Sequence, residues 1–100
     1  MLFLFLPGIL PCVIGGITSL GGVVDSANLD NTHGVALVPD RKIVLVTSWN
    51  LHKLSVFSYE DSNNLEFLSN VADSTLMLKA WGVSYDNTRD MAVVSARHGN

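Results

Sequence analysis

Charged side chains are scarce in this sequence, because Lys, Arg, Asp and Glu together make up 15% of its 100 residues. Hydrophobic residues make up 48%, and nine acidic against six basic residues give a formal net charge of −3. A disordered chain has the opposite composition, so disorder is excluded. The basic residues are scattered along the chain and form no positive stripe, which argues against a nucleic-acid partner.

Cysteine occurs once, at Cys12. A single thiol cannot form an internal disulfide, so the cysteine content does not indicate whether the protein works in a reducing or an oxidising compartment. Cys12 also lies in an apolar stretch without an activating neighbour, which argues against a catalytic thiol. The sequence lacks the G-x-S-x-G nucleophile elbow and the Gly-Lys-Ser/Thr of a phosphate loop. We therefore assign no catalytic, cofactor-binding or metal-binding residue.

No charged side chain precedes Asp25. Residues 1–16 resemble the apolar core of a signal peptide, although the usual positive n-region is missing. A membrane anchor is an alternative, interrupted by Pro7 and Pro11. Another alternative is a start codon misplaced within a longer gene. We interpret residues 1–16 as a leader or anchor, which predicts a secreted or cell-surface protein, or one whose only membrane contact is a retained leader.

Helical periodicity is missing as well, since no window of 11 or more residues shows a 3.6-residue apolar period with caps. Short apolar or alternating runs bounded by turn residues predict an all-β fold with about seven short antiparallel strands. The predicted strands cover residues 17–24, 34–38, 42–49, 53–60, 65–72, 82–86 and 90–97.

The strand predicted at residues 42–49 is apolar on both faces. Ile43 and Leu45 point to one side, and Val44 and Val46 point to the other. Such a strand must be covered on both sides. The strand at 65–72 is polar on one face, which is typical of an outer strand.

Residues 19–52 align without a gap on residues 67–100 when the sequence is shifted by 48 positions, a shift that we call the repeat offset. The eight identities keep an Asp-Ser pair and a Gly-Val pair at the same separation, and apolar runs match apolar runs. They are Leu20/Leu68, Val23/Val71, Asp25/Asp73, Ser26/Ser74, Gly34/Gly82, Val35/Val83, Arg41/Arg89 and Val46/Val94.

Four short strands in a repeat of this length are typical of a β-propeller blade, and a two-sheet sandwich is the alternative. Residues 17–100 then hold the outer strand of one blade (17–24), a full blade (34–72) and the first two strands of the next (82–97). Propellers close with about 4–8 blades. We therefore predict a partial propeller whose uncovered faces and edges bind a protein partner or a second copy.

The recurring Asp-Ser and Gly-Val pairs are the candidate structural positions of the repeat. We expect each Asp to cap the connection from an outer strand to the next inner strand. Asp25, Asn28 and Asp30 also suggest a Ca²⁺ loop, but the second copy has Leu76 and Leu78 at the matching places, which favours an Asx-turn. The candidate positions are Asp25, Ser26, Gly34, Val35, Asp73, Ser74, Gly82 and Val83.

His33 and Trp81 occupy the same place in the repeat, immediately before the Gly-Val pair. In a closed propeller this place lies near the central channel, where a histidine can act as a ligand or a base. Because its counterpart is a tryptophan, the position is not chemically fixed. We interpret Trp81, together with Trp49, Phe57 and Tyr59, as packing between blades.

The units DSANLDNTHGVAL, IVLVTS, LSVFSY and LEFLSNVADS resemble LVIVD-type repeats, which form β-propellers in secreted and cell-surface proteins and are related in fold to lactonase-like and YVTN-type propellers. The sequence departs from that pattern at Val56–Ser58 and at Trp81. The resemblance implies a non-enzymatic interaction or scaffold protein with a protein or glycan partner. A fragment of a lactonase-like enzyme, or a truncated product without its own function, are the alternatives, and no catalytic residue carries over.

Overall fold

The structure, a computed structural model, describes residues 2–6, 18–60 and 64–98, and for residues 2–6 and 18–21 it describes the backbone alone. The described chain is all-β, as predicted, with a single short 3₁₀ helix, η1 (Pro39–Arg41). The strands are β1 (Leu2–Leu6), β2 (Thr18–Val23), β3 (Thr32–Val38), β4 (Ile43–Ser48), β5 (Lys53–Ser58), β6 (Glu66–Ala72), β7 (Ala80–Asp86) and β8 (Met91–Ala96).

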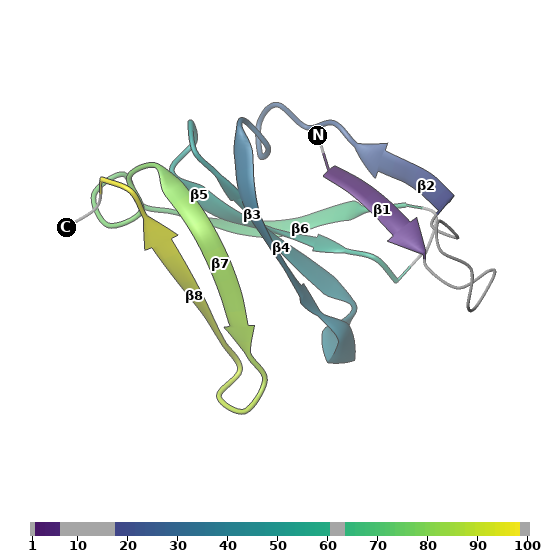
Figure 1. Cartoon of the computed structure of the whole chain (residues 1–100). Coiled ribbons are helices and arrows are strands. Elements are labelled where there is room, and N and C mark those ends of the chain that lie inside the picture. Colours follow the sequence, from purple (N-terminus) through teal and green to yellow (C-terminus); the bar gives the residue numbers. More distant parts are fainter. Residues whose placement is uncertain (1, 7–17, 61–63, 99–100) are drawn as a thin grey trace.

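These strands form three antiparallel sheets. The central sheet has the order β3-β4-β5-β6, and β1-β2 and β7-β8 are two-stranded. The central sheet lies between the other two in the view of Figure 1. Seven strands coincide with the predicted ones to within a few residues at their ends.

The eighth strand, β1, is not among the predicted strands, because it falls in the segment 1–16 that we interpret as a leader or anchor. It pairs with β2 from Leu2–Val23 to Leu6–Thr18. Most of that segment, including Cys12, lies outside the described residues, so its interpretation stays a prediction. Within the described part of the chain, no helix is long and apolar enough to cross a membrane.

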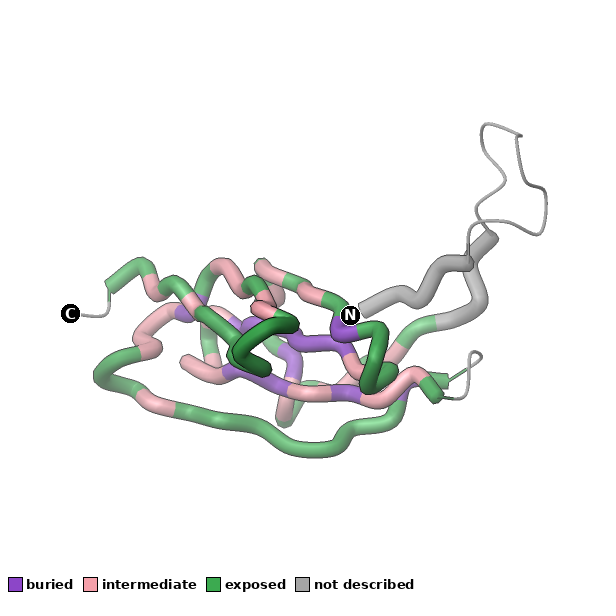
Figure 2. Tube along the Cα trace, turned by 90° about the horizontal axis from the view of Figure 1, so that it is seen from below, coloured by how far each residue is buried: buried purple, intermediate pink, exposed green. Residues whose placement is uncertain are grey.

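The central sheet buries a cluster of apolar side chains on each face. Val44, Val46 and Phe57 belong to the first cluster, with Leu29, Leu65 and, at its edge, Val23 and Tyr59. Leu45, Leu54 and Val38 form the second cluster, which β7 and β8 cover with Val83, Tyr85 and Val94. The alternation predicted for β4 is therefore observed. Buried residues run through the middle of the molecule (Figure 2).

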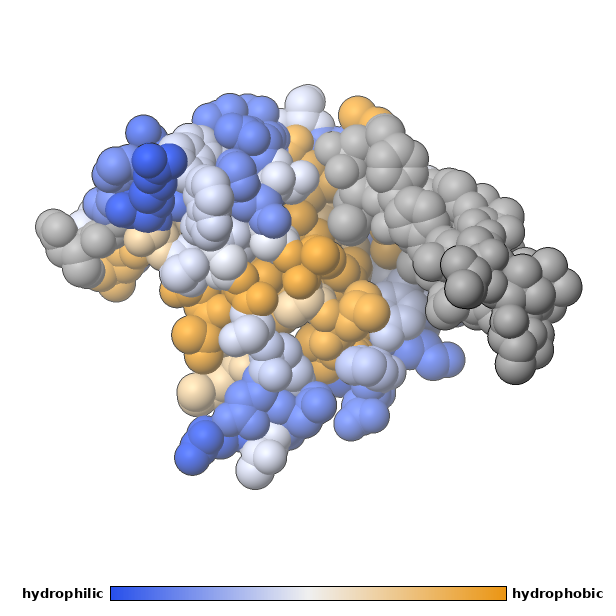
Figure 3. Space-filling view, in the orientation of Figure 1, coloured by the Kyte–Doolittle hydropathy of each residue, from blue (hydrophilic) through white to orange (hydrophobic). Residues whose placement is uncertain are grey.

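The outer strand β6 is exposed at all seven of its residues, in agreement with its predicted place at the edge of the sheet. Apolar side chains also gather across the middle of the face shown in Figure 3, between polar ends. The fold therefore covers β4 and β5 well and leaves much of β3, β6, β7 and β8 open.

The pairing geometry of the strands recurs at the repeat offset. Each of the five Cα pairs between β3 and β4, from Thr32–Ser48 to Val38–Ile43, has a counterpart between β7 and β8, from Ala80–Ala96 to Asp86–Met91. The register shift falls at the same place in both. The turns match too, because Lys42 and Asp90 both have left-handed backbones, with φ of 52° and 54°.

Candidate functional site

The first strands of two neighbouring sheets, β3 and β7, meet at Gly34. A Cβ atom on Gly34 would lie 2.6 Å from the carbonyl oxygen of Trp81, so only glycine permits this approach. The hydroxyl of Thr47, which is fully buried, donates to that carbonyl at 2.6 Å and accepts from the Gly34 N–H at 2.8 Å. One threonine thus joins both sheets, and we call this place the sheet junction.

Three aromatic rings lie at the end of the sheet junction where β3 and β7 begin. His33 stacks on Trp81 with 4.0 Å between ring centroids. Trp49, which follows β4, lies 5.2 Å from His33 and 5.1 Å from Trp81. Aromatic contacts at such separations add roughly 0.5–1.5 kcal/mol each beyond their burial. The structure thus brings the two predicted residues into direct contact across the two sheets.

Two cations surround these rings. The Lys79 ammonium lies 5.3 Å from the Trp49 centroid, and the Arg97 guanidinium lies 5.4 Å from Trp49 and 5.9 Å from Trp81. Distances below about 6 Å are typical of cation–π contacts. Trp81 and Arg97 also line a hollow of about 300 Å³ with Ser95 and Ala96. The Arg97 guanidinium and the Trp81 indole face could contact a planar or anionic group in this hollow. Their contacts with the neighbouring aromatic rings also account for both side chains as packing.

The connection that leads into β3 begins with a capped turn at Asp25. Its carboxylate accepts hydrogen bonds from the backbone N–H groups of Ala27 (3.1 Å) and Asn28 (3.2 Å) and from the Asn28 amide (2.8 Å). These bonds lower the pKa of Asp25 below 3.8, and the bond from the Asn28 side chain has the largest effect.

Asp73, at the repeat offset from Asp25, caps the connection into β7 in the same way. Its carboxylate accepts from the N–H groups of Thr75 and Leu76, both at 2.8 Å, and the bond from Leu76 above all lowers its pKa below 3.8. Ser26 and Ser74, next to the two Asp residues, are both exposed. No group of three or more His, Cys, Asp or Glu side chains that can hold a metal ion occurs among the described residues.

The loop from Asp25 to β3 is fastened to the central sheet by polar contacts. The hydroxyls of Ser48 and Ser55, both fully buried, donate to the carbonyl oxygen of Asn28 at 2.9 and 3.0 Å. Leu29 in the same loop is buried in the first apolar cluster. The Asn28 carbonyl and Leu29 therefore tie the loop to the core, whereas Ser26 and Asp30 remain exposed.

Two lateral faces leave apolar side chains open. Val35 and Leu37 on β3 are 57% and 59% exposed, and Met91 and Val93 on β8 are 47% and 56% exposed. The residues at the repeat offset from them are covered: Val83 and Tyr85 pack against the second apolar cluster, and Leu45 is buried in it with Ile43 beside it. Each open face thus carries residues whose counterparts at the repeat offset form the contact between the central sheet and the sheet β7-β8.

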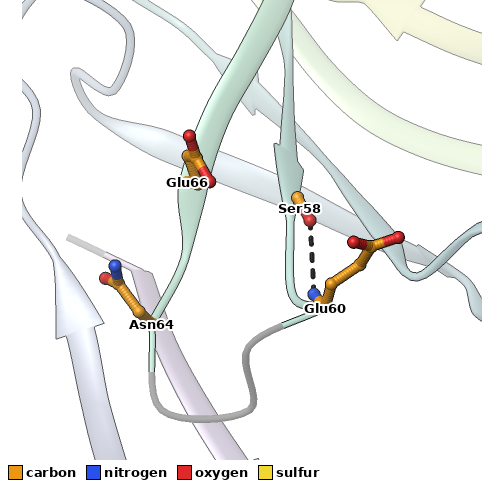
Figure 4. A pocket seen from close by; sticks show the side chains of 4 residues that line it. All are labelled: Ser58, Glu60, Asn64 and Glu66. Atoms are coloured by element: carbon orange, nitrogen blue, oxygen red, sulfur yellow. Dashed lines mark hydrogen bonds between the residues drawn. The ribbon is translucent and has the colours of Figure 1, made fainter.

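A second hollow, of about 360 Å³, lies between the end of β5 and the start of β6 and is lined by Ser58, Glu60, Asn64 and Glu66. The Glu60 carboxylate points away from Glu66 in Figure 4, while the Glu60 N–H donates to the Ser58 hydroxyl at 3.2 Å. The hollow therefore does not bring its two carboxylates together.

Four residues at the sheet junction or beside it were not predicted from the sequence: Thr47, His52, Lys79 and Arg97. The His52 ring nitrogen Nδ1 accepts from the Lys79 N–H at 2.9 Å, and the His52 backbone carbonyl accepts from the Asp73 N–H at 3.2 Å. His52 therefore holds both ends of the connection from Asp73 to β7. The repeat offset pairs Trp49 with Arg97, but residues at equivalent places need not touch, so no sequence signal predicted their contact.

The comparison of this sequence with models of known protein families found no match, and the comparison with curated proteins found none either.

Proposed function

We propose that this chain is a non-enzymatic interaction or scaffold module made of blade-like units of a β-propeller, as the resemblance to LVIVD-type repeats implies, and that it acts at the cell surface or after secretion. The four-stranded central sheet supports a blade, and the recurrence of strand pairing at the repeat offset supports the repeat. The proposed binding role rests on the open faces, and the proposed location rests on the leader-like residues 1–16 and on the resemblance.

The observation that carries the proposal is the difference between covered and open counterparts. Val83 and Tyr85 pack on the central sheet, whereas Val35 and Leu37 are more than half exposed. Exposed apolar patches on folded proteins mark places where another surface binds. The module therefore binds through its lateral faces, and the partner is apolar at the contact.

Sedimentation velocity over a range of protein concentrations tests this function. The full chain should sediment above the mass of one copy, and a variant with Val35→Asp and Leu37→Asp should associate at least about tenfold more weakly, which corresponds to about 1.4 kcal/mol. The matched control is Val71→Asp, since Val71 is 60% exposed on the outer strand. A monodisperse monomer that melts cooperatively would contradict the proposal.

A further inference from the structure

Strands β1 and β8 are among the strands that have a single neighbour within the described residues: β1 pairs with β2, and β8 pairs with β7. An open strand edge presents unpaired N–H and C=O groups and is a template for another strand. Open edges alone do not choose a partner, because β6 has one as well. The register of the two outer sheets, β1-β2 and β7-β8, identifies which open edges pair with each other.

The sheet β1-β2 has the backbone register of β5-β6. Each Cα pair between β1 and β2, from Leu2–Val23 to Leu6–Thr18, corresponds to a pair between β5 and β6, from Leu54–Val71 to Ser58–Glu66. The register shift falls at the same place in both. Strand β2 precedes β6 by the repeat offset, whereas β1 precedes β5 by slightly more, because the connection from β1 to β2 is longer than that from β5 to β6.

The two outer sheets are thus complementary halves of the central sheet. The sheet β7-β8 repeats β3-β4, and β1-β2 repeats β5-β6, so the one contact without a counterpart is that between β4 and β5. In one copy, β7 and β8 cover the second apolar cluster, whereas Val23 at the end of β2 packs against the first, on the opposite face. The two halves of one copy therefore cannot meet.

We propose that β8 of one copy pairs antiparallel with β1 of a second copy, completing a four-stranded sheet of order β7-β8-β1-β2 across the contact. This names the partner of the lateral faces and therefore rests on the proposed function. The pairs of β4 with β5, shifted by the same offsets, predict the register Met91–Leu6, Val93–Leu4 and Ser95–Leu2. Such a head-to-tail contact builds rings or filaments.

The lateral faces agree with this pairing. The sheet β1-β2 of the second copy lies on the face of its central sheet that carries Val35 and Leu37, since these two residues pair with Val46 and Val44 of the first apolar cluster. The incoming β8 brings Met91 and Val93 to that face. All four side chains, about half exposed or more in a single copy, become covered as their counterparts already are.

Disulfide trapping in the full chain tests this proposal. In a Cys12→Ser background, Val93→Cys and Leu4→Cys chains are mixed and mildly oxidised, because Cα atoms of directly opposite residues lie within disulfide reach. The disulfide-linked mixed dimer should form about 100-fold faster from this pair than from the control pairs, because the contact holds the two thiols close together and raises their effective concentration. The controls are Val93→Cys with Phe5→Cys, one register position away, and Val71→Cys with Leu4→Cys, on the edge of β6.

Circular dichroism must show the same strand content for all variants. Oligomers that form without preferential trapping of the 93–4 pair, or that trap 93 with 93, would overturn this pairing and leave the proposed function standing. A chain that stays monomeric at every concentration would overturn both.

Discussion

Strands β4 and β8 are separated by the repeat offset and have different surroundings. They pair in the same register with the strand before them. Five of the six residues of β4 are buried, whereas none of β8 is. β4 has β5 beside it and both faces covered, whereas β8 has only β7 beside it among the described residues and packs on the central sheet through Val94 alone. A strand that is apolar on both faces needs neighbouring elements on both sides, and it is buried only where those neighbours are present.

The sharpest way to break this comparison is to truncate the same position in both strands. Leu45 is 4% exposed in the second apolar cluster, and its counterpart Val93 is 56% exposed. Leu45→Ala should lower the free energy of unfolding by about 2–5 kcal/mol, because it leaves a cavity. Val93→Ala should change it by at most about 0.5 kcal/mol. Urea denaturation at one low protein concentration measures both, and equal losses would contradict the difference in surroundings.

A smaller effect is expected from methyl groups added at the two corresponding glycines. A Cβ on Gly34 would collide with the backbone of Trp81 and Val83, at 2.6 and 3.0 Å, whereas one on Gly82 meets only the Ser95 hydroxyl, at 3.1 Å. Gly34→Ala should therefore cost about 1–3 kcal/mol, the usual penalty of overpacking. Gly82→Ala should be neutral or stabilising by up to about 1 kcal/mol. Thermal unfolding compares the two, and a harmless Gly34→Ala would show that the sheet junction is not tightly closed.

The smallest effect concerns the two capped turns at low pH, where the two copies should behave alike. Hydrogen bonds lower the pKa of Asp25 and Asp73 below 3.8 in the folded chain. A lowered folded-state pKa stabilises the fold above the unfolded value, and this stabilisation is lost as the pH falls through the folded pKa. Unfolding midpoints should therefore stay level down to about pH 4 and then decline with a contribution from both residues.

Replacement of both residues, Asp25→Asn with Asp73→Asn, should reduce that decline below about pH 4, because the amide oxygen still accepts hydrogen bonds but does not titrate. The corresponding variant at Asp86, whose bond from Arg89 also lowers its pKa, is the control outside the two connections. An unchanged acid profile in the double variant would show that the two caps carry no acid sensitivity.

Much of the fold was predictable because apolar alternation and turn residues act locally. The predicted strand at 42–49 became β4, and its two faces were assigned correctly from the alternation of Ile43 to Val46. β1 was missed because the longer connection after it hides its offset from an ungapped alignment. The contact between His33 and Trp81 was missed because a shared place in a repeat does not say that the two copies of that place touch.

The sequence by itself determined the all-β fold, the order of the strands along the chain and the two Asp caps, because periodicity, turn chemistry and short-range hydrogen bonds depend on neighbours in the chain. Only the tertiary structure decided that Gly34 lies against Trp81, that three aromatic rings gather at the sheet junction and that β4 is buried while β8 is open. Those facts depend on which sheets lie side by side. Residues separated by the repeat offset come into contact, or become covered, only when the sheets that carry them pack together.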